Sequence, residues 1–217
     1  MAETCDLPHV APGELAAMLP PASTALVVVD IQTDFAAPEG LMGSFGADLA
    51  PVEAAIDRIE ALVAAARKAG VTMAFMRVVT RPETDPAVLK TLMARRGMPG
   101  GEAICRADDG GANYYRVAPL PGDIEIEKLM FDSFHGTDLD QQLKARGIDT
   151  VVMTGVSTEC CVDSTARSAF HYGYNVFVVS DACAAYEPGL HAATLAVLEK
   201  NLALLAVSDA VIEAWRD

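Results

Sequence analysis

The chain lacks a long hydrophobic run. No stretch within its 217 residues approaches the roughly 20 apolar residues of a membrane span. Residues 1–20 also lack the basic start and the continuous apolar core of a secretory signal. We therefore expect a cytoplasmic protein with no membrane partner.

Basic residues are scarce relative to acidic ones. The sequence contains 16 Lys and Arg against 30 Asp and Glu, which gives a formal net charge of -14 and an isoelectric point near 4.6. A polyanion would be repelled over most of such a surface. A nucleic-acid partner is therefore not expected.

Disulfide and metal-binding patterns are also missing. The five cysteines are an odd number without CxxC spacing, so neither a disulfide scaffold nor a zinc knuckle is predicted. The four histidines lie far apart in sequence and form no HxH or HExxH motif. The sequence therefore predicts no metal site.

Apolar residues, by contrast, are abundant. They make up 52% of the chain, and the mean hydropathy is +0.26, which is ample for the core of one domain. β-branched runs alternate with segments of helical spacing, which predicts a three-layer α/β/α fold around a mainly parallel, six-stranded, Rossmann-like sheet. The expected strands are 25–29, 71–79, 123–127, 150–154, 174–179 and 203–207. The expected helices are 48–69, 86–96, 137–146, 188–200 and 208–215, with one more after the turn at Gly155.

Two proline-rich segments interrupt this alternation. Residues 1–22 are rich in Pro and Ala and are predicted to be an arm that lies over the body or reaches a neighbour. Residues 23–217 are predicted to form a single domain. Within it, residues 80–122 are rich in Pro and Gly, and loops of this length in compact domains are often lids. We expect this segment to cover the ligand crevice.

Polar residues stand at the ends of three expected strands. Asp30 follows the first strand, Lys128 ends the third, and Cys160 and Cys161 follow the fourth. The carboxyl ends of central strands border the ligand crevice in open α/β sheets. Taken singly, such a carboxylate equally often caps a loop, and such a lysine is usually a solvated charge.

The two adjacent cysteines are candidate nucleophiles. The first N–H groups of a helix lack intrahelical partners and the helix dipole is positive there, so the pKa of a first-turn thiol is expected to fall. Most free cysteines, however, are small buried hydrophobes. Position alone does not choose between Cys160 and Cys161.

Two stretches of sequence carry a family resemblance. They are VVVDIQTDF (27–35) and EIEKLMFDSFHGTDLDQQLKARGIDTVVMTGVSTECCVDSTARSAFHYGYNVFVVSDACAA (125–185). Together they resemble the isochorismatase-like cysteine hydrolases, which include nicotinamidases, N-carbamoylsarcosine amidohydrolase, ureidoacrylate and biuret amidohydrolases, and isochorismatase. The resemblance covers nearly all of residues 24–217, weakens over 80–122, and does not include the arm.

The resemblance implies a catalytic triad. It places the family's Asp, Lys and Cys at Asp30, Lys128 and Cys161, and the pattern Gly-Val-Ser-Thr-x-x-Cys-Val at 155–162 selects Cys161 over Cys160. In this mechanism the aspartate accepts the thiol proton and the sulfur attacks an amide-type carbonyl. The thioester is then hydrolysed, and no cofactor is required.

The same pattern implies an oxyanion hole. By resemblance, the peptide bond between Val156 and Ser157 is cis, and the N–H groups of Ser157 and Cys161 bind the developing oxyanion. Glu159 follows, where many relatives have a small or amide residue. We interpret its charge as favourable at a helix start rather than as part of the pocket.

Besides Glu159, the sequence departs from some relatives at a metal-binding position. Nicotinamidase-type relatives place an Asp and histidines after the second strand, but residues 80–85 contain no histidine. A metal-dependent nicotinamidase is therefore not expected.

The leading functional prediction is a cysteine amidohydrolase that cleaves the C–N bond of a small amide, carbamoyl or ureide compound. One alternative is an enol-ether hydrolase like isochorismatase, although those members typically lack a nucleophilic thiol. Another is a degenerate relative that acts as an interaction module. The resemblance also implies a homodimer or homotetramer.

The lid and the strand ends supply the expected substrate contacts. An arginine among them would imply a carboxylate substrate. The predicted substrate-binding residues are Phe35, Asn113, Tyr114 and Phe134, with Tyr115, Arg77, Arg81 and Arg106 as further candidates.

Overall fold

A computed structural model describes residues 7–216 of the chain. Six strands form one sheet in the order β3-β2-β1-β4-β5-β6, and all neighbouring strands are parallel. The predicted α/β fold is therefore confirmed. The strands are β1 (Thr24–Val29), β2 (Thr72–Val78), β3 (Ile124–Lys128), β4 (Thr150–Val156), β5 (Asn175–Ala184) and β6 (Leu204–Ala206).

Helices and helical turns connect these strands. The α-helices are α1 (Pro12–Met18), α2 (Thr33–Ala36), α3 (Leu41–Ser44), α4 (Ala50–Ala69), α5 (Ala87–Arg95), α6 (Leu139–Ala145), α7 (Asp163–His171), α8 (Pro188–Asn201) and α9 (Ser208–Ala214). A 3-10 turn, η1 (Pro21–Ser23), precedes β1, and a π-helical turn, η2 (Thr158–Val162), precedes α7.

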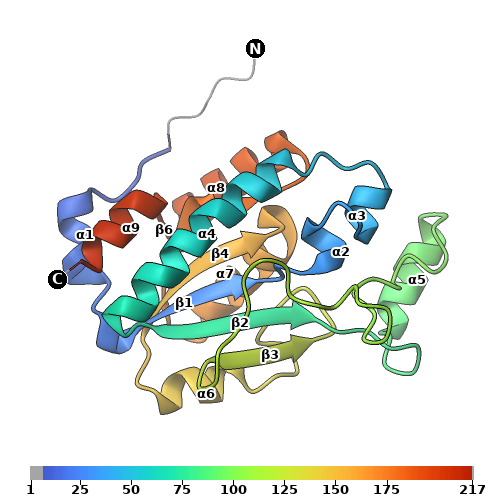
Figure 1. Cartoon of the computed structure of the whole chain (residues 1–217), viewed down its shortest axis with the longest axis horizontal. Coiled ribbons are helices and arrows are strands. Elements are labelled where there is room, and N and C mark those ends of the chain that lie inside the picture. Colours follow the sequence, from blue (N-terminus) through green and yellow to red (C-terminus); the bar gives the residue numbers. More distant parts are fainter. Residues whose placement is uncertain (1–6, 217) are drawn as a thin grey trace.

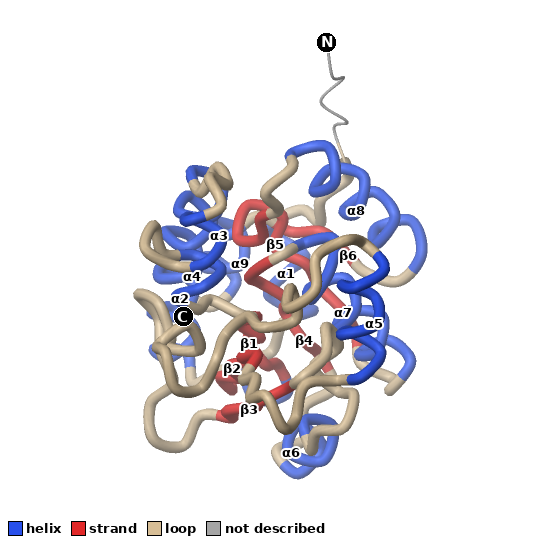
Figure 2. The backbone as a smooth tube through the Cα atoms, turned by 90° about the vertical axis from the view of Figure 1, so that its right-hand side faces the viewer, coloured by secondary structure: helices blue, strands red, loops and turns tan. Residues whose placement is uncertain are grey.

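The sheet is buried on both faces. Along β1, Leu26 and Val28 pack into one apolar cluster, while Val27 and Val29 pack into the other. Helices α1, α4 and α9 cover the first face, and α6, α7 and α8 cover the second. Figure 2 shows the strands between α4 and α9 on one side and α7 and α8 on the other. This arrangement explains why the strands are continuous apolar runs instead of alternating ones.

The apolar residues that recur with helical spacing in α4 form the face that packs against the sheet. The helix ends at Gly70, which has a left-handed φ of 75°. Burying each large aliphatic side chain contributes about 1.5–3 kcal/mol, so this stripe anchors the helix to the sheet. The buried stripe consists of Val52, Ala55, Ile56, Ile59, Leu62 and Ala66.

The strand order creates a switch point between β1 and β4. The chain runs outward from β1 through β2 to β3 and then returns to place β4 on the other side of β1. A crevice forms at the carboxyl ends of strands where the order reverses in this way. Figure 1 shows α2, α3 and α5 beyond this end of the sheet and α1 at the opposite end.

The described part of the predicted arm packs against its own chain. Residues 1–6 lie outside the described residues, but Leu15 and Leu19 are fully buried. The Trp215 indole N–H donates to the Leu19 carbonyl over 3.2 Å, which joins the segment after α1 to α9. The sequence did not indicate α1, because its seven residues are too few to show a periodicity. The domain limits at residues 22 and 23 remain a prediction.

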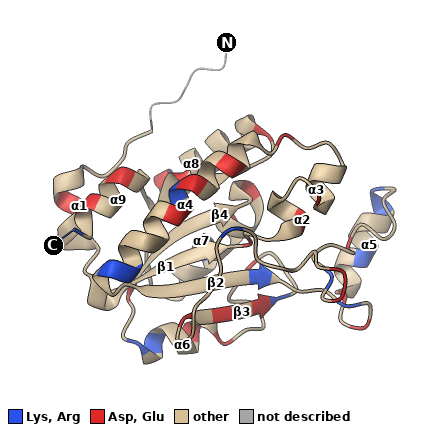
Figure 3. Cartoon of the chain, in the orientation of Figure 1, with Lys and Arg blue, Asp and Glu red and all other residues tan. Residues whose placement is uncertain are grey.

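Charge on the surface is mostly negative. Figure 3 shows acidic residues, coloured red on the ribbon, in α1, α4, α9 and β3. In the part of the chain that the structure describes, no helix combines the length and apolar character needed to cross a membrane.

Strands β1 and β4 approach closely at Gly155. Its φ is +117°, and a Cβ there would collide with backbone atoms of Val29. Gly155→Ala is expected to lower the free energy of unfolding by about 3 kcal/mol or more, because neither strand can yield. Gly189→Ala is the control, since a Cβ there meets nothing within 4 Å. Urea titration should show a change within about 1 kcal/mol for the control, and equal losses in the two variants would contradict the close approach.

Candidate active site

Asp30 lies at the switch point, directly after β1. Its φ is 55°, a left-handed value that non-glycine residues rarely adopt. Its N–H donates to the Met76 carbonyl over 3.0 Å, and its carbonyl accepts the Gln32 N–H over 2.9 Å. The residue is fully buried. This sharp turn fixes a carboxylate at the place where the strand order reverses.

Lys128 reaches Asp30 from the end of β3. Because β2 lies between β3 and β1 and neighbouring strands are about 4.8 Å apart, only a long side chain can span this gap. The Lys128 Nζ donates to Asp30 Oδ2 over 2.8 Å, to the Met130 carbonyl over 3.1 Å and to the Phe131 carbonyl over 3.0 Å. All donors of the ammonium group are used. Lys128 is therefore a buried structural cation and not a solvated charge.

The Asp30 and Lys128 pair shifts the pKa of both groups. Burial raises the pKa of Asp30 above its ordinary value of 3.8, although Lys128 opposes the shift. Burial acts to lower the pKa of Lys128, but the Asp30 charge and hydrogen bond outweigh it, so the net pKa is raised. Lys128 stays charged at neutral pH, and Asp30 is a stronger base than an exposed aspartate.

Cys161 lies on η2, beside this pair. Its side chain is buried, and its thiol is close enough to influence the pKa of both Asp30 and Lys128. Asp30 Oδ1 is also buried and has no hydrogen-bond partner among the described residues. The carboxylate thus keeps one acceptor unused in the interior of the protein.

The expected lowering of the Cys161 pKa was wrong. Contact with Cys160, burial and the charge of Asp30 raise the pKa of Cys161 well above its ordinary value, although Lys128 opposes this shift. The reason is local structure: Cys161 lies in a buried π-helical turn next to a carboxylate, instead of in an accessible first turn of an α-helix. The shift favours the neutral form of the Cys161 thiol. The same contact lowers the pKa of Cys160.

A cavity of about 200 Å³ opens onto Cys161. It is smaller than the roughly 300–1,000 Å³ of sites for drug-sized ligands, so it suits a small molecule. Residues of the 80–122 segment, the predicted lid, form part of its wall. The wall consists of Phe35, Met42, Val78, Thr80, Leu89, Met93, Gly101, Glu102, Ile104, Leu129, Met130, Phe131, Val156, Ser157, Cys160, Cys161 and Tyr186.

The Val156–Ser157 peptide bond is cis, as predicted. Both residues line the cavity next to Cys161. Ser157 Oγ donates to Glu159 Oε1 over 3.0 Å, and Glu159 is not part of the cavity wall. Glu159 thus holds the loop that carries the cis bond.

Only one of the four predicted substrate-binding residues, Phe35, lines the cavity. Tyr114 is turned toward β3, where its hydroxyl donates to Glu125 over 3.2 Å. Phe134 is buried in the core and stacks on Tyr172 with ring centroids 5.1 Å apart. The structure therefore places Tyr114 and Phe134 outside the cavity, because neighbouring aromatic and charged groups hold them elsewhere.

Asn113 lies on the outer side of the lid. It borders a separate hollow with Asp109 and Gly110, and its carbonyl accepts the Thr33 N–H over 2.9 Å. Its role is to join the lid to α2 through the backbone. It does not contribute to the wall around Cys161.

The remaining candidates, three arginines and Tyr115, lie away from the cavity. Arg106 forms a two-pronged ion pair with Asp85 over 2.6 and 2.8 Å. Arg77 pairs with acidic residues of β3, and Arg81 is exposed. Tyr115 donates to Glu53 on α4 over 2.9 Å. None of the four belongs to the cavity wall.

Gln32 and Asp34, which follow β1, join this part of the chain to the 80–122 segment and to the end of β2. The sequence analysis predicted no role for either residue. The Gln32 amide donates to the Val78 carbonyl over 2.8 Å and to the Ala112 carbonyl over 3.0 Å. Asp34 accepts the Cys105 N–H over 2.7 Å. The sequence DIQTD (30–34) places both residues close to Asp30, and this closeness could have indicated that they support the site. Glu102 and Tyr186 carried no signal in the sequence.

The histidines near the sheet make structural hydrogen bonds. His191 Nδ1 pairs with Thr158 Oγ1 over 2.8 Å at the start of η2, and burial lowers the pKa of His191. His9 Nε2 pairs with Ser180 Oγ over 2.8 Å. Between residues 7 and 216, no three His, Cys, Asp or Glu side chains gather into a metal-binding group.

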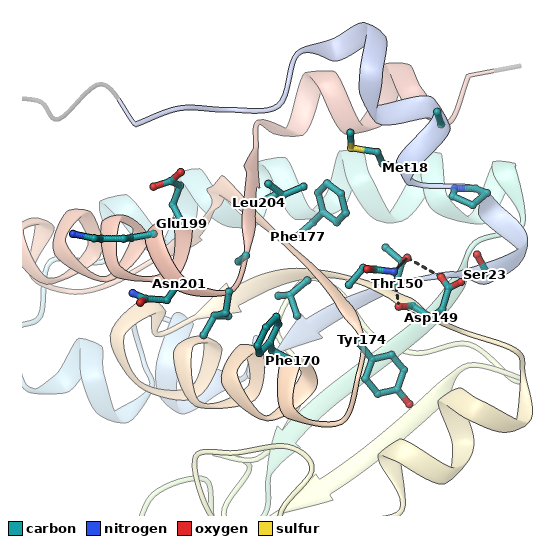
Figure 4. A pocket seen from close by; sticks show the side chains of 17 residues that line it. Met18, Ser23, Asp149, Thr150, Phe170, Tyr174, Phe177, Glu199, Asn201 and Leu204 are labelled. Carbon is teal, nitrogen blue, oxygen red and sulfur yellow. Dashed lines mark hydrogen bonds between the residues drawn. The ribbon is translucent and has the colours of Figure 1, made fainter.

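A larger cavity of about 660 Å³ lies at the other end of the strands, beside their amino ends. Residues from the amino ends of β4 and β6, such as Thr150 and Leu204, line it (Figure 4), and Asn175 at the start of β5 also belongs to its wall. Asp149 in its wall accepts a hydrogen bond from Thr150 Oγ1 over 2.8 Å. Its wall, taken from the described residues, contains no cysteine, whereas Cys160 and Cys161 line the smaller cavity.

Comparisons with known proteins identify the family of the chain. The isochorismatase domain model matches residues 24–210. A ureidoacrylate amidohydrolase of Methylobacterium radiotolerans is 36% identical over 194 residues, which cover 83% of this chain and 75% of that protein. A cysteine hydrolase from Pseudomonas syringae pv. phaseolicola has a TM-score of 0.81 at 26% identity, covering 97% of this chain and 98% of the other. An N-carbamoylsarcosine amidase from Thermoplasma acidophilum has a TM-score of 0.69 at 28% identity, covering 86% and 97%. The chain therefore belongs to the isochorismatase family.

Proposed function

We propose that this protein is a cysteine-dependent amidohydrolase that cleaves the C–N bond of a small amide, carbamoyl or ureide compound through a thioester. The observation that carries the proposal is that the Asp30 and Lys128 ion pair lies beside Cys161, which lines a small cavity. These groups come from the ends of three separate strands. A nucleophile, a base and a fixed cation are the parts that such chemistry needs.

The first step forms the thioester. The unpartnered Asp30 Oδ1 accepts the thiol proton of Cys161 as the sulfur attacks the substrate carbonyl. The N–H groups of Ser157 and Cys161 bind the developing oxyanion, an interaction worth about 2.7–4 kcal/mol per donor in other enzymes. Because the pKa of Cys161 is raised, transfer of its proton to Asp30 accompanies the attack.

The second step releases the product and restores the thiol. Protonated Asp30 donates its proton to the leaving amine or ammonia, and the C–N bond breaks. Asp30 then accepts a proton from water, which attacks the thioester, and the proton returns to the sulfur of Cys161. Lys128 keeps its proton throughout and stabilises the negative charge that passes between the other two groups.

The named relatives support an amide-type substrate. Ureidoacrylate amidohydrolase and N-carbamoylsarcosine amidase are named for the hydrolysis of ureido and carbamoyl compounds. The cysteine at position 161 disfavours an enol-ether hydrolase, and the intact cluster of Asp30, Lys128 and Cys161 disfavours a degenerate interaction module.

The proposal is tested by incubating the purified protein with a panel of small amides, carbamoyl compounds and ureides and measuring the release of ammonia or amine. We expect turnover of at least one member by the wild-type protein and none above background by Cys161→Ala. Turnover at the wild-type rate by Cys161→Ala would overturn the proposal.

The pH dependence of activity follows from Asp30. Only its ionised form can accept the thiol proton, so kcat/KM should fall as the pH drops through the pKa of Asp30. Burial raises that pKa above 3.8, so the acid limb should lie above the range of an ordinary aspartate. A pH profile of kcat/KM checks this, and constant activity down to pH about 4 would contradict a base with a raised pKa.

A further inference from the structure

The cavity beside Cys161 has a predominantly apolar wall. Phe35, Leu89, Met93, Ile104 and Phe131 enclose most of it. Apolar walls favour a substrate with an apolar body, and the few polar groups among them fix its orientation.

Basic groups are not available to a ligand in this cavity. Its wall, taken from the described residues, contains no Arg, Lys or His. Lys128, which lies nearby, spends its donors on Asp30 and two carbonyls. Arg106 of the lid is held by Asp85 and Thr80. A substrate carboxylate would therefore enter without a partner for its charge, at a high desolvation cost.

An acidic side chain, Glu102, does face this space. It lies in the lid, forms part of the cavity wall, and its Oε2 is buried without a hydrogen-bond partner. A buried carboxylate oxygen without a partner is costly and calls for an explanation, and for one that borders a cavity a ligand that supplies the missing donor is such an explanation. An ionised carboxylate accepts hydrogen bonds and donates none.

We propose that Glu102 is a specificity-determining residue that binds an N–H group of the substrate. The substrate class is a small amide or ureide with an apolar body, a hydrogen-bond-donating nitrogen and no carboxylate. This inference rests on the proposed function, since it names the substrate class of the same site. It also separates this chain from relatives named for ureidoacrylate, which is a carboxylate.

The cavity can be tested without turnover, by alkylation of Cys161. Iodoacetamide is neutral and carries an N–H donor, whereas iodoacetate has the same size and a negative charge. In the Cys160→Ala background, the rate ratio of iodoacetamide to iodoacetate at Cys161 should exceed the ratio for 2-mercaptoethanol by roughly tenfold or more. A ratio at or below that of 2-mercaptoethanol would overturn the inference.

Two variants assign this selectivity to Glu102. Glu102→Gln should lower the ratio roughly three- to tenfold, because it removes the negative charge facing the cavity. Glu83→Gln changes the net charge equally at an exposed position of the same segment and should leave the ratio unchanged. Equal effects of the two variants would overturn the role of Glu102. The ratio of the two alkylation rates can be measured without a substitution at Glu102 or Glu83. The inference therefore stays testable if Glu102→Gln does not fold.

Substrate competition separates this inference from the proposed function. Neutral apolar ureides should have a higher kcat/KM than ureidoacrylate, and Glu102→Gln should narrow the difference. Preference for ureidoacrylate would overturn the inference and leave the amidohydrolase intact. Absence of any amide hydrolysis would overturn the proposed function, while the alkylation ratio would still report on the cavity.

Discussion

Cys161→Ala is expected to lower kcat/KM by about 10⁴-fold or more, because removing the nucleophile of a catalytic triad leaves only the contribution of substrate binding and the oxyanion hole. The fold should persist. Cys161 is buried but small, and the substitution removes a single sulfur from a site that already borders a cavity. Steady-state kinetics with the best substrate of the panel, together with thermal unfolding, would separate the two effects.

The matched control for this prediction is Cys160→Ala. Cys160 also lines the cavity and is the more exposed thiol of the pair, so it is the direct competitor for the role of nucleophile. We expect it to retain activity within about tenfold, because its loss removes a contact and not the attacking atom. Loss of activity in Cys160→Ala, with activity retained in Cys161→Ala, would reverse the assignment.

Lys128→Met is expected to lower the free energy of unfolding by about 3–5 kcal/mol, because it leaves the Asp30 carboxylate buried without a compensating charge. Two carbonyl groups also lose their donor. Activity should fall with stability, since Asp30 then binds a proton more tightly and no longer acts as a base at neutral pH. Urea titration and a pH profile would measure the two effects.

Two further variants test whether the unpaired buried charge of Asp30 causes the loss of stability in Lys128→Met. Adding Asp30→Asn to Lys128→Met should restore a large part of the stability but no activity, since the stranded charge is gone and so is the base. Lys144→Met breaks an ion pair with Asp140 in which the lysine side chain is 56% exposed and should cost less than about 1 kcal/mol. A Lys128→Met variant as stable as Lys144→Met would contradict the buried ion pair.

The sequence was sufficient to predict the sheet and the three strand ends. Continuous apolar runs such as Val27 to Val29 indicated strands buried on both faces, and a parallel sheet places the ends of such strands along one edge. Asp30, Lys128 and Cys161 stand at those ends, so their proximity follows from topology. The choice of Cys161 over Cys160, and the cis bond after Val156, came from the resemblance and not from physics.

Other features depend on tertiary environment and could not be predicted. The pKa of Cys161 is raised by contact with Cys160, by burial and by the charge of Asp30, which lies 131 positions earlier in the sequence. Phe134 and Tyr114 are aromatic residues near predicted site segments, yet contacts with Tyr172 and Glu125 turn them away from the cavity. Glu102 lies in the irregular lid, where no periodicity indicates which side chains point inward.

The central claim is that Cys161 forms a thioester with the substrate. The most direct test is to measure the mass of the enzyme after acid quenching during turnover. In the Cys160→Ala background, acid quenching during a burst of leaving-group release should trap the acyl part of the substrate on the peptide that contains Cys161. Hydroxylamine should remove this group, as expected of a thioester, and Cys161→Ala should never acquire it. A burst without an acyl group on Cys161, or the same acyl mass on Cys161→Ala, would contradict the account.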